Sequence, residues 1–269
     1  MSASGTAPRR ADVGVYGGTG LYTLLDDVED VVVDTPYGPP AAPVAIGDVA
    51  GRRVAFLPRH GRDHSLPPHR VPYRANAWAL RELGARAVFG PCASGSLHAD
   101  LHPGDFVVPD QIVDRTAGRA ASFHDGPDSP PGIAPVDHLT FAEPYDERLR
   151  KVALAACQAE GVTVHDGGTV VVIEGPRFST QAESRWYAAQ GWQVINMTQM
   201  PEAALCAELG LPYASIALVT DYDAGLEGAP GIEPVTMDEV MATLASNAER
   251  VRTVLFRAIA DLPDELFED

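Results

Sequence analysis

Short apolar runs rich in β-branched residues alternate with segments of helical periodicity from about residue 12 onward. The runs have the length and composition of buried strands, and they cover residues 13–16, 54–57, 87–89, 169–173, 194–197 and 213–220. The clearest helical segments cover residues 74–83, 146–160, 181–190 and 201–209. Because strands and helices alternate in this way, the sequence predicts an α/β sandwich.

Two helix starts carry the spacing of a capping box. Thr180 precedes Glu183, and Thr236 precedes Glu239, each by three residues. The second start opens a long C-terminal helix with one apolar stripe, which we expect to pack mostly in the core. That stripe consists of Met237, Val240, Met241, Leu244, Val251, Leu255 and Ile259.

With 269 residues and 45% hydrophobic composition, the chain is long enough to bury a sizeable core. We expect a flexible extension over residues 1–11 and a single domain over residues 12–269. The sequence shows no apolar run of membrane-spanning length and no secretory signal. Cys92, Cys157 and Cys206 have neither disulfide nor zinc spacing, which favours a cytoplasmic protein. A formal charge of −17 argues against nucleic acid as a partner.

Polar motifs follow four of the predicted strands, where ligands of open α/β sheets gather. These motifs are Gly17-Gly18-Thr19-Gly20, Arg59-His60, Asn196-Met197-Thr198 and Asp221-Tyr222-Asp223. A long irregular stretch from about residue 117 to 144 lies within the same domain. Its length is typical of a functional loop or an interface.

The first two motifs are candidates for binding an anion. The glycine-rich motif at residues 17–20 offers backbone N–H groups and a hydroxyl, although a plain structural turn remains an alternative and the spacing fits no Walker or dinucleotide loop. Arg59 and His60 could hold two oxygens of a phosphate, or could be ordinary surface charge. His60 and His64 have the spacing of a metal pair, but no third ligand follows at a suitable distance.

Two further motifs could recognise a flat base. Phe178 and Ser179 lie between a strand and a capped helix, where the ring could stack on a base or pack in the core. Asp221 and Asp223 are two residues apart, so in an extended strand both face one side. In a closed cavity one carboxyl of such a pair can donate a hydrogen bond while the other accepts, which suits a 6-aminopurine. An acidic turn, or half of a divalent-cation site, is the alternative.

Taken together, these motifs closely resemble the trimeric purine nucleoside phosphorylase superfamily and, within it, the methylthioadenosine phosphorylase branch. The resemblance extends from about residue 13 to residue 259. It is carried by the motifs above and by Asp34-Thr35-Pro36-Tyr37-Gly38, Arg59-His60-Gly61-Arg62-Asp63-His64, Pro103-Gly104-Asp105, Glu174-Gly175-Pro176-Arg177-Phe178-Ser179 and Pro201-Glu202. It implies a single-domain, three-layer α/β/α sandwich with a mixed central sheet.

The resemblance also implies a role for individual residues. Those implied to hold phosphate are Thr19, Arg59, His60, Cys92, Ala93 and Thr198. Those implied to surround the nucleoside are Phe178, Ser179, Met197, His64, Met237 and Val240, together with His138 from a neighbouring subunit of a homotrimer. Asp221 and Asp223 are implied to bind the purine, and we expect Asp223 to donate to its N7.

The expected reaction is phosphorolysis of 5'-methylthioadenosine to adenine and 5-methylthioribose 1-phosphate. Inorganic phosphate is then a co-substrate, and the chemistry requires neither a metal nor a cofactor. A phosphorylase for 6-oxopurine nucleosides, methylthioinosine or a broad range of nucleosides is the main alternative, and a non-catalytic purine-binding protein is a remote one. Cys92 departs from the threonine that is typical of the branch, and because a thiol is a weak donor it could lower the affinity for phosphate.

Overall fold

The computed structural model describes residues 11–18, 25, 27–226, 232 and 235–268, whose strands form two hydrogen-bonded sheets. The first sheet has the order β12-β5-β1-β4-β3-β2. Its strands are β1 (Val13–Gly17), β2 (Glu29–Val31), β3 (Val44–Val49), β4 (Arg52–Pro58), β5 (Ala87–Phe89) and β12 (Tyr213–Ala214). The four strands from β12 to β4 are parallel, whereas β3 and β2 add to the edge in antiparallel pairs.

The second sheet is mixed and has the order β8-β10-β11-β6-β13-β7-β9. Its strands are β6 (Cys92–Ser96), β7 (Phe106–Val108), β8 (Gln111–Arg115), β9 (Val164–Asp166), β10 (Thr169–Ile173), β11 (Val194–Asn196) and β13 (Ala217–Tyr222). β6 pairs with β13 in parallel and with β11 in antiparallel fashion. The central strands of this sheet therefore end at the segments that carry the polar motifs.

The two sheets continue into each other at two places. β5 leads into β6 and β12 leads into β13, and the backbone bonds from Gly90 N to Ala214 O (2.9 Å) and from Cys92 N to Ile216 O (3.2 Å) join the turns between them. The α/β fold with mixed strands is confirmed. The single central sheet is replaced by two sheets, and the strand predicted at residues 213–220 is two strands, because the chain bends between Ala214 and Ala217.

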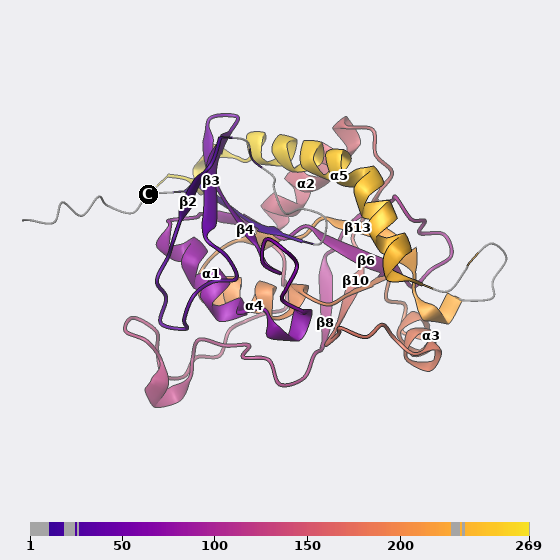
Figure 1. Cartoon of the computed structure of the whole chain (residues 1–269), viewed down its shortest axis with the longest axis horizontal. Coiled ribbons are helices and arrows are strands. Elements are labelled where there is room, and N and C mark those ends of the chain that lie inside the picture. Colours follow the sequence, from indigo (N-terminus) through magenta and orange to yellow (C-terminus); the bar gives the residue numbers. More distant parts are fainter. Residues whose placement is uncertain (1–10, 19–24, 26, 227–231, 233–234, 269) are drawn as a thin grey trace, which may run out of the picture.

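Helices cover both sides of the strands, which gives the three layers visible in Figure 1. α2 (Glu147–Ala159) and α5 (Met237–Ala260) lie on one side, and α1 (Tyr73–Glu82) and α4 (Gln199–Glu208) lie on the other. α3 (Gln181–Ala189) follows the loop after β10, and the short 3₁₀ turns are η1 (Pro68–Arg70), η2 (Gly126–Asp128), η3 (Ala224–Leu226) and η4 (Asp264–Leu266). None of the helices that the structure describes is long and apolar enough to cross a membrane.

Both capping boxes are present, at Thr180 with Glu183 and at Thr236 with Glu239. The apolar stripe of α5 is buried at Val240, Leu244, Val251, Leu255 and Ile259. The stripe packs mostly in the core as expected, but the side chains of its two methionines, Met237 and Met241, are 45% and 37% exposed. Met237 lines a cavity instead of the core, so the first turn of α5 belongs to the site described below.

The ends of the domain differ slightly from the prediction. Residues 1–10 of the expected extension lie outside the described residues, but Ala11 is buried and its N–H donates to Leu83 O at 2.7 Å.

The stretch at residues 117–144 is irregular as predicted and contains only the one 3₁₀ turn, η2. Strands β2, β3 and β6 to β9 were not predicted.

Candidate active site

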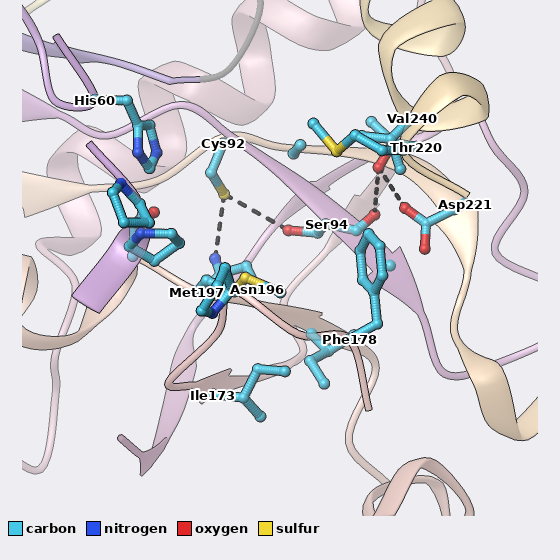
Figure 2. Close-up of a pocket in the computed structure, with 18 of the residues that line it drawn as sticks. His60, Cys92, Ser94, Ile173, Phe178, Asn196, Met197, Thr220, Asp221 and Val240 are labelled. Carbon is cyan, nitrogen blue, oxygen red and sulfur yellow. Dashed lines mark hydrogen bonds between the residues drawn. The ribbon is translucent and has the colours of Figure 1, made fainter. Parts of the chain in front are cut away.

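A cavity of about 400 Å³ opens where the strands of both sheets end, and it collects most of the predicted site residues. Figure 2 shows His60 and Cys92 at one end, and Phe178, Asp221 and Val240 at the other. The lining includes the predicted residues Arg59, His60, His64, Cys92, Ala93, Phe178, Met197, Thr198, Asp221, Asp223, Met237 and Val240. Twelve residues from distant parts of the sequence are thus brought together by the strand ends.

Three predicted site residues are not among those that line the cavity. Thr19 lies outside the described residues. Ser179 is buried behind the wall, and its hydroxyl has no hydrogen-bond partner among the described residues. His138 is exposed on the irregular stretch of the same chain. Its implied role requires a neighbouring subunit.

Arg59 follows β4 and is almost completely buried, with 1% of its surface exposed. Its Nε and Nη2 donate to the carboxylate of Glu202 at 2.6 and 3.1 Å, and Nη1 donates to Pro91 O at 2.9 Å. The ion pair with Glu202 keeps the pKa of Arg59 raised against the opposing effect of burial. A side chain at Gly18 would place its Cβ 2.8 Å from Arg59 Nη1, so this part of the glycine motif makes room for the guanidinium.

His60 turns its Nδ1 toward Leu66 O, at 2.8 Å. Burial, with the charge of Arg59, lowers the pKa of His60 to about 4, so the ring is neutral at neutral pH. The ring of His64 lies 4.8 Å from that of His60, and burial lowers its pKa as well. His64 has a φ of 55°, an uncommon left-handed conformation for a residue other than glycine. Among the described residues, no group of three or more His, Cys, Asp or Glu side chains could hold a metal ion.

Cys92 begins β6, and its sulfur is surrounded by polar groups. The side-chain amides of Asn196 and Gln199 donate to Sγ at 3.3 and 3.2 Å, and the hydroxyl of Ser94 lies 3.6 Å away. Gln199 is itself fixed, since its Nε2 also bonds Ser215 Oγ at 2.6 Å. The cysteine is therefore part of a buried hydrogen-bond network.

Thr198 lies at the start of α4, yet its side chain makes no capping hydrogen bond to the helix. The backbone at Met200 is not helical, so the regular part of the helix begins one residue later. Thr198 is buried and lines the cavity beside Met197. Its hydroxyl is therefore available to a ligand.

Asp221 and Asp223 come from the end of β13 and line the same cavity. Burial, aided by the charge of Asp223, raises the pKa of Asp221 to about 6, while Thr220 Oγ1 donates to Asp221 Oδ1 at 2.6 Å. Burial also raises the pKa of Asp223, whose Oδ2 has no partner among the described residues. Both carboxyl groups therefore hold a proton up to a higher pH than an exposed carboxyl does.

The close approach of Asp221 to β6 depends on a glycine. A Cβ at Gly95 would lie 2.9 Å from Asp221 Oδ2 and 3.1 Å from the side chain of Ile195. The register of β13 against β6 also shifts between Val219 and Asp221. The predicted extended geometry is therefore modified by an irregularity, but both carboxyl groups still reach one cavity.

Several residues that shape the site were given no role by the sequence. Glu202 belongs to the motif Pro201-Glu202 and Asn196 to the motif Asn196-Met197-Thr198, so the sequence held a signal for both residues. Gln199 and Arg119 had no such signal. Arg119 lies in the irregular stretch, and its guanidinium bonds the carbonyl oxygens of Met197 (2.8 Å), Met200 (2.6 Å) and Glu174 (2.7 Å).

Comparison with known proteins shows the family to which this chain belongs. The profile of the Phosphorylase superfamily matches residues 12–260. A purine nucleoside phosphorylase of Streptomyces coelicolor is 55% identical over 255 residues, which cover 94% of this chain and 90% of that protein. An S-methyl-5'-thioadenosine phosphorylase of Mycolicibacterium smegmatis is 52% identical over 248 residues, or 92% and 90% of the two chains.

A solved structure shows the same similarity in three dimensions. The methylthioadenosine phosphorylase from Schistosoma mansoni in complex with adenine has a TM-score of 0.87 and 39% sequence identity to this chain. The similarity covers 93% of this chain and 91% of the other. On the profile, the relatives and the fold together, this chain belongs to the phosphorylase superfamily, and within it to the family of the methylthioadenosine phosphorylases.

Proposed function

We propose that this chain catalyses the phosphorolysis of 5'-methylthioadenosine to adenine and 5-methylthioribose 1-phosphate. The observation that carries the proposal is the buried pair Asp221 and Asp223, with the pKa of Asp221 raised to about 6. Asp221 lies at the opposite end of the cavity from His60 (Figure 2), and Asp223 and Arg59 line the same cavity. Such a pair can accept from the exocyclic amine of adenine and donate toward N7. The opposite end suits an anion.

The two ends of the cavity fit the two halves of this reaction. Breaking an N-glycosidic bond creates positive charge on the sugar and negative charge on the leaving purine. A phosphate held beside Arg59, His60 and Thr198 stabilises the first charge and is also the nucleophile. The proton shared by Asp221 and Asp223 neutralises the second, and we keep Asp223 as the group that donates to N7. The reaction, so arranged, uses inorganic phosphate as co-substrate and no cofactor.

The part of the cavity around α5 supports an apolar 5' substituent. Val240 is buried, and Met237, although 45% exposed, lines the same cavity. His64 also lines the cavity and, with its pKa lowered by burial, is neutral near pH 7. A methylthio group suits two apolar side chains better than a charged group would.

A purine nucleoside phosphorylase of different base preference is the second candidate. It is favoured by the name of the Streptomyces coelicolor relative, which is 55% identical to this chain. The carboxyl pair separates the two candidates, because a 6-oxopurine presents an acceptor where adenine presents a donor. Names of relatives from Mycolicibacterium smegmatis and Mycobacterium tuberculosis favour methylthioadenosine.

A homotrimeric, cytoplasmic enzyme is part of the proposal. His138 is exposed between Val136 and Leu139, whose side chains are 69% and 40% exposed. Contact with a second copy would bury these apolar side chains and could bring His138 to a neighbouring cavity. The mass of the protein in solution, measured by light scattering, tests this assembly, and a monomer with full activity would contradict it.

The decisive experiment compares substrates with and without phosphate. Purified protein is incubated with methylthioadenosine, inosine or methylthioinosine, and free adenine or hypoxanthine is measured. We expect adenine release that requires added phosphate and exceeds hypoxanthine release from both oxopurine nucleosides. A strong preference for the oxopurines would overturn the proposed specificity. Purine binding without any turnover would overturn the enzymatic function.

A further inference from the structure

The orientation of His60 fixes which of its nitrogens carries a proton. Its Nδ1 lies 2.8 Å from Leu66 O, and a carbonyl oxygen can only accept, so Nδ1 must carry the hydrogen. Burial and Arg59 keep the ring neutral near pH 7. Nε2 of the neutral ring therefore has a lone pair and acts as an acceptor.

Arg59 is the one residue with a permanent positive charge among the described residues that line the cavity. Its charge is already matched by Glu202, which is 2% exposed and bonded through both carboxylate oxygens. The third contact of Arg59, to Pro91 O, uses one of the two N–H groups of Nη1. This end of the cavity consequently has little positive charge left with which to balance a dianion.

Asn196 adds a second acceptor at the same end. Its Nδ2 donates to Cys92 Sγ at 3.3 Å, while its Oδ1 is buried without a partner among the described residues. Asn196 is 6% exposed and lines the cavity next to Cys92 (Figure 2). A buried carbonyl oxygen of this kind is best satisfied by a ligand that donates.

Two acceptors and a neutralised guanidinium suit an anion with two protons to donate, which is one more than HPO₄²⁻ carries. Resting on the function proposed above, we infer that phosphate binds with the uptake of one proton, which is shared between a phosphate oxygen and Nε2 of His60. The equilibrium is balanced as HPO₄²⁻ plus one proton from solvent, with a single O–H or N–H bond formed. A different oxygen of the phosphate remains free to attack the sugar.

The groups around His60 make this proton depend on phosphate. Arg59 and His64 both disfavour a positive charge on the ring, and Leu66 O is bonded to the other nitrogen. Glu202 is turned toward Arg59, and Asp221 and Asp223 lie at the purine end of the cavity. The negative charge of bound phosphate is what shifts the balance toward protonation.

Calorimetry of phosphate binding in buffers with different heats of ionisation measures this proton directly. At about pH 8 free phosphate has lost its second proton, so we expect the enzyme to take up about one proton for each phosphate bound. Phosphate binding without proton uptake would overturn the inference and leave the proposed function intact. Absence of any phosphate binding would overturn both.

Two variants locate the proton. His60→Gln places an amide that does not titrate near Nε2, and we expect weaker phosphate binding with uptake reduced to less than half of the wild-type value. His124→Asn is the matched control, because Nδ1 of His124 also bonds a backbone carbonyl, Ala134 O at 2.8 Å, and His124 does not line the cavity. Uptake should remain unchanged in the control. Full uptake in His60→Gln would exclude His60 as the proton's site and overturn the inference.

Discussion

Arg119 and Glu174 are joined twice, through the carboxylate of Glu174 (Nε to Oε2, 3.1 Å) and through its backbone carbonyl (Nη2 to O, 2.7 Å). The Arg119 side chain is 2% exposed, although it comes from the irregular stretch of the chain. The same guanidinium also bonds Met197 O and Met200 O. One side chain thus connects the ends of β10 and β11 to the start of α4, and all three segments contribute residues to the cavity.

Replacing Arg119 should disturb both the stability and the site. In Arg119→Met the buried carbonyls of Glu174, Met197 and Met200 lose their donor, and we expect the free energy of unfolding to fall by about 3 kcal/mol or more. We also expect kcat to fall more than the KM for nucleoside rises, since the segments that carry Phe178 and Thr198 lose their common anchor. Denaturant titration and steady-state kinetics measure the two effects.

Chemical rescue distinguishes positioning from mere stability. Added guanidinium at a concentration well below denaturing should restore part of kcat in the Arg119→Met variant. Arg257→Met is a control, because Arg257 bonds Glu160 in an exposed pair far from the cavity, and neither kcat nor its response to guanidinium should change. An Arg119→Met enzyme with wild-type kcat would contradict the positioning role.

The pKa of Asp221 predicts how the stability of the ligand-free protein changes with pH. Burial raises this pKa from 3.8 to about 6, so the folded state favours the neutral carboxyl. The neutral carboxyl of Asp221 stabilises the folded protein fully when the pH is below the pKa that Asp221 has in the unfolded chain. This stabilisation is lost as the pH rises through the pKa that Asp221 has in the folded protein. The rise of the Asp221 pKa corresponds to about 3 kcal/mol of unfolding free energy, which is lost between about pH 4 and pH 7.

Asp221→Asn removes the titrating group and should remove this change. The difference in unfolding free energy between wild type and variant should therefore vary with pH over that window, as measured by denaturant titration at several pH values. Asp48→Asn, at an exposed position of β3, serves as the control and should follow the wild type. If Asp221→Asn also follows the wild type, Asp221 ionises normally in the folded protein.

Asp223 should determine the preference between aminopurines and oxopurines. In Asp223→Asn the side chain always offers an N–H donor beside N7, and an oxopurine presents the acceptor O6 next to N7. We expect the ratio of kcat/KM for inosine to that for methylthioadenosine to rise by at least about tenfold. An unchanged ratio would show that Asp223 does not read the base, and the same measurement on Asp221→Asn would then test its neighbour.

The sequence predicted the elements that carry the site because their signals are local. Runs such as residues 170–173 are apolar over their whole length, and the capping boxes at Thr180 and Thr236 need only four residues each. β2, β8 and β9 are half-exposed or exposed and weakly apolar, so no comparable signal marked them. The bend between β12 and β13 was not predicted because Ser215 is the one polar residue there, and apolar residues continue on both sides of it.

Site residues could be predicted from the sequence where their role depends on their own residue type. They could not be predicted where the role depends on a partner far away in the sequence. Asp221, Asp223, Arg59 and His60 stood out as polar residues at strand ends. The partner of Arg59 lies 143 positions away, and nothing in the local pattern indicates that Glu202 would neutralise it. Most contacts of Arg119 are with backbone carbonyls, which any sequence provides, so they leave no pattern of residues to read.

Cys92 offers a test of the one position that departs from the expected motif. Its sulfur accepts from the amides of Asn196 and Gln199, and a hydroxyl in its place could accept from them and also donate to phosphate. In Cys92→Thr we therefore expect the KM for phosphate to fall by about three- to tenfold, the effect of one added hydrogen bond. The KM for nucleoside should stay the same. Cys92→Ala leaves the amide of Asn196 without its acceptor and should raise the KM for phosphate. Equal phosphate KM values in all three enzymes would mean that residue 92 only fills space beneath the site.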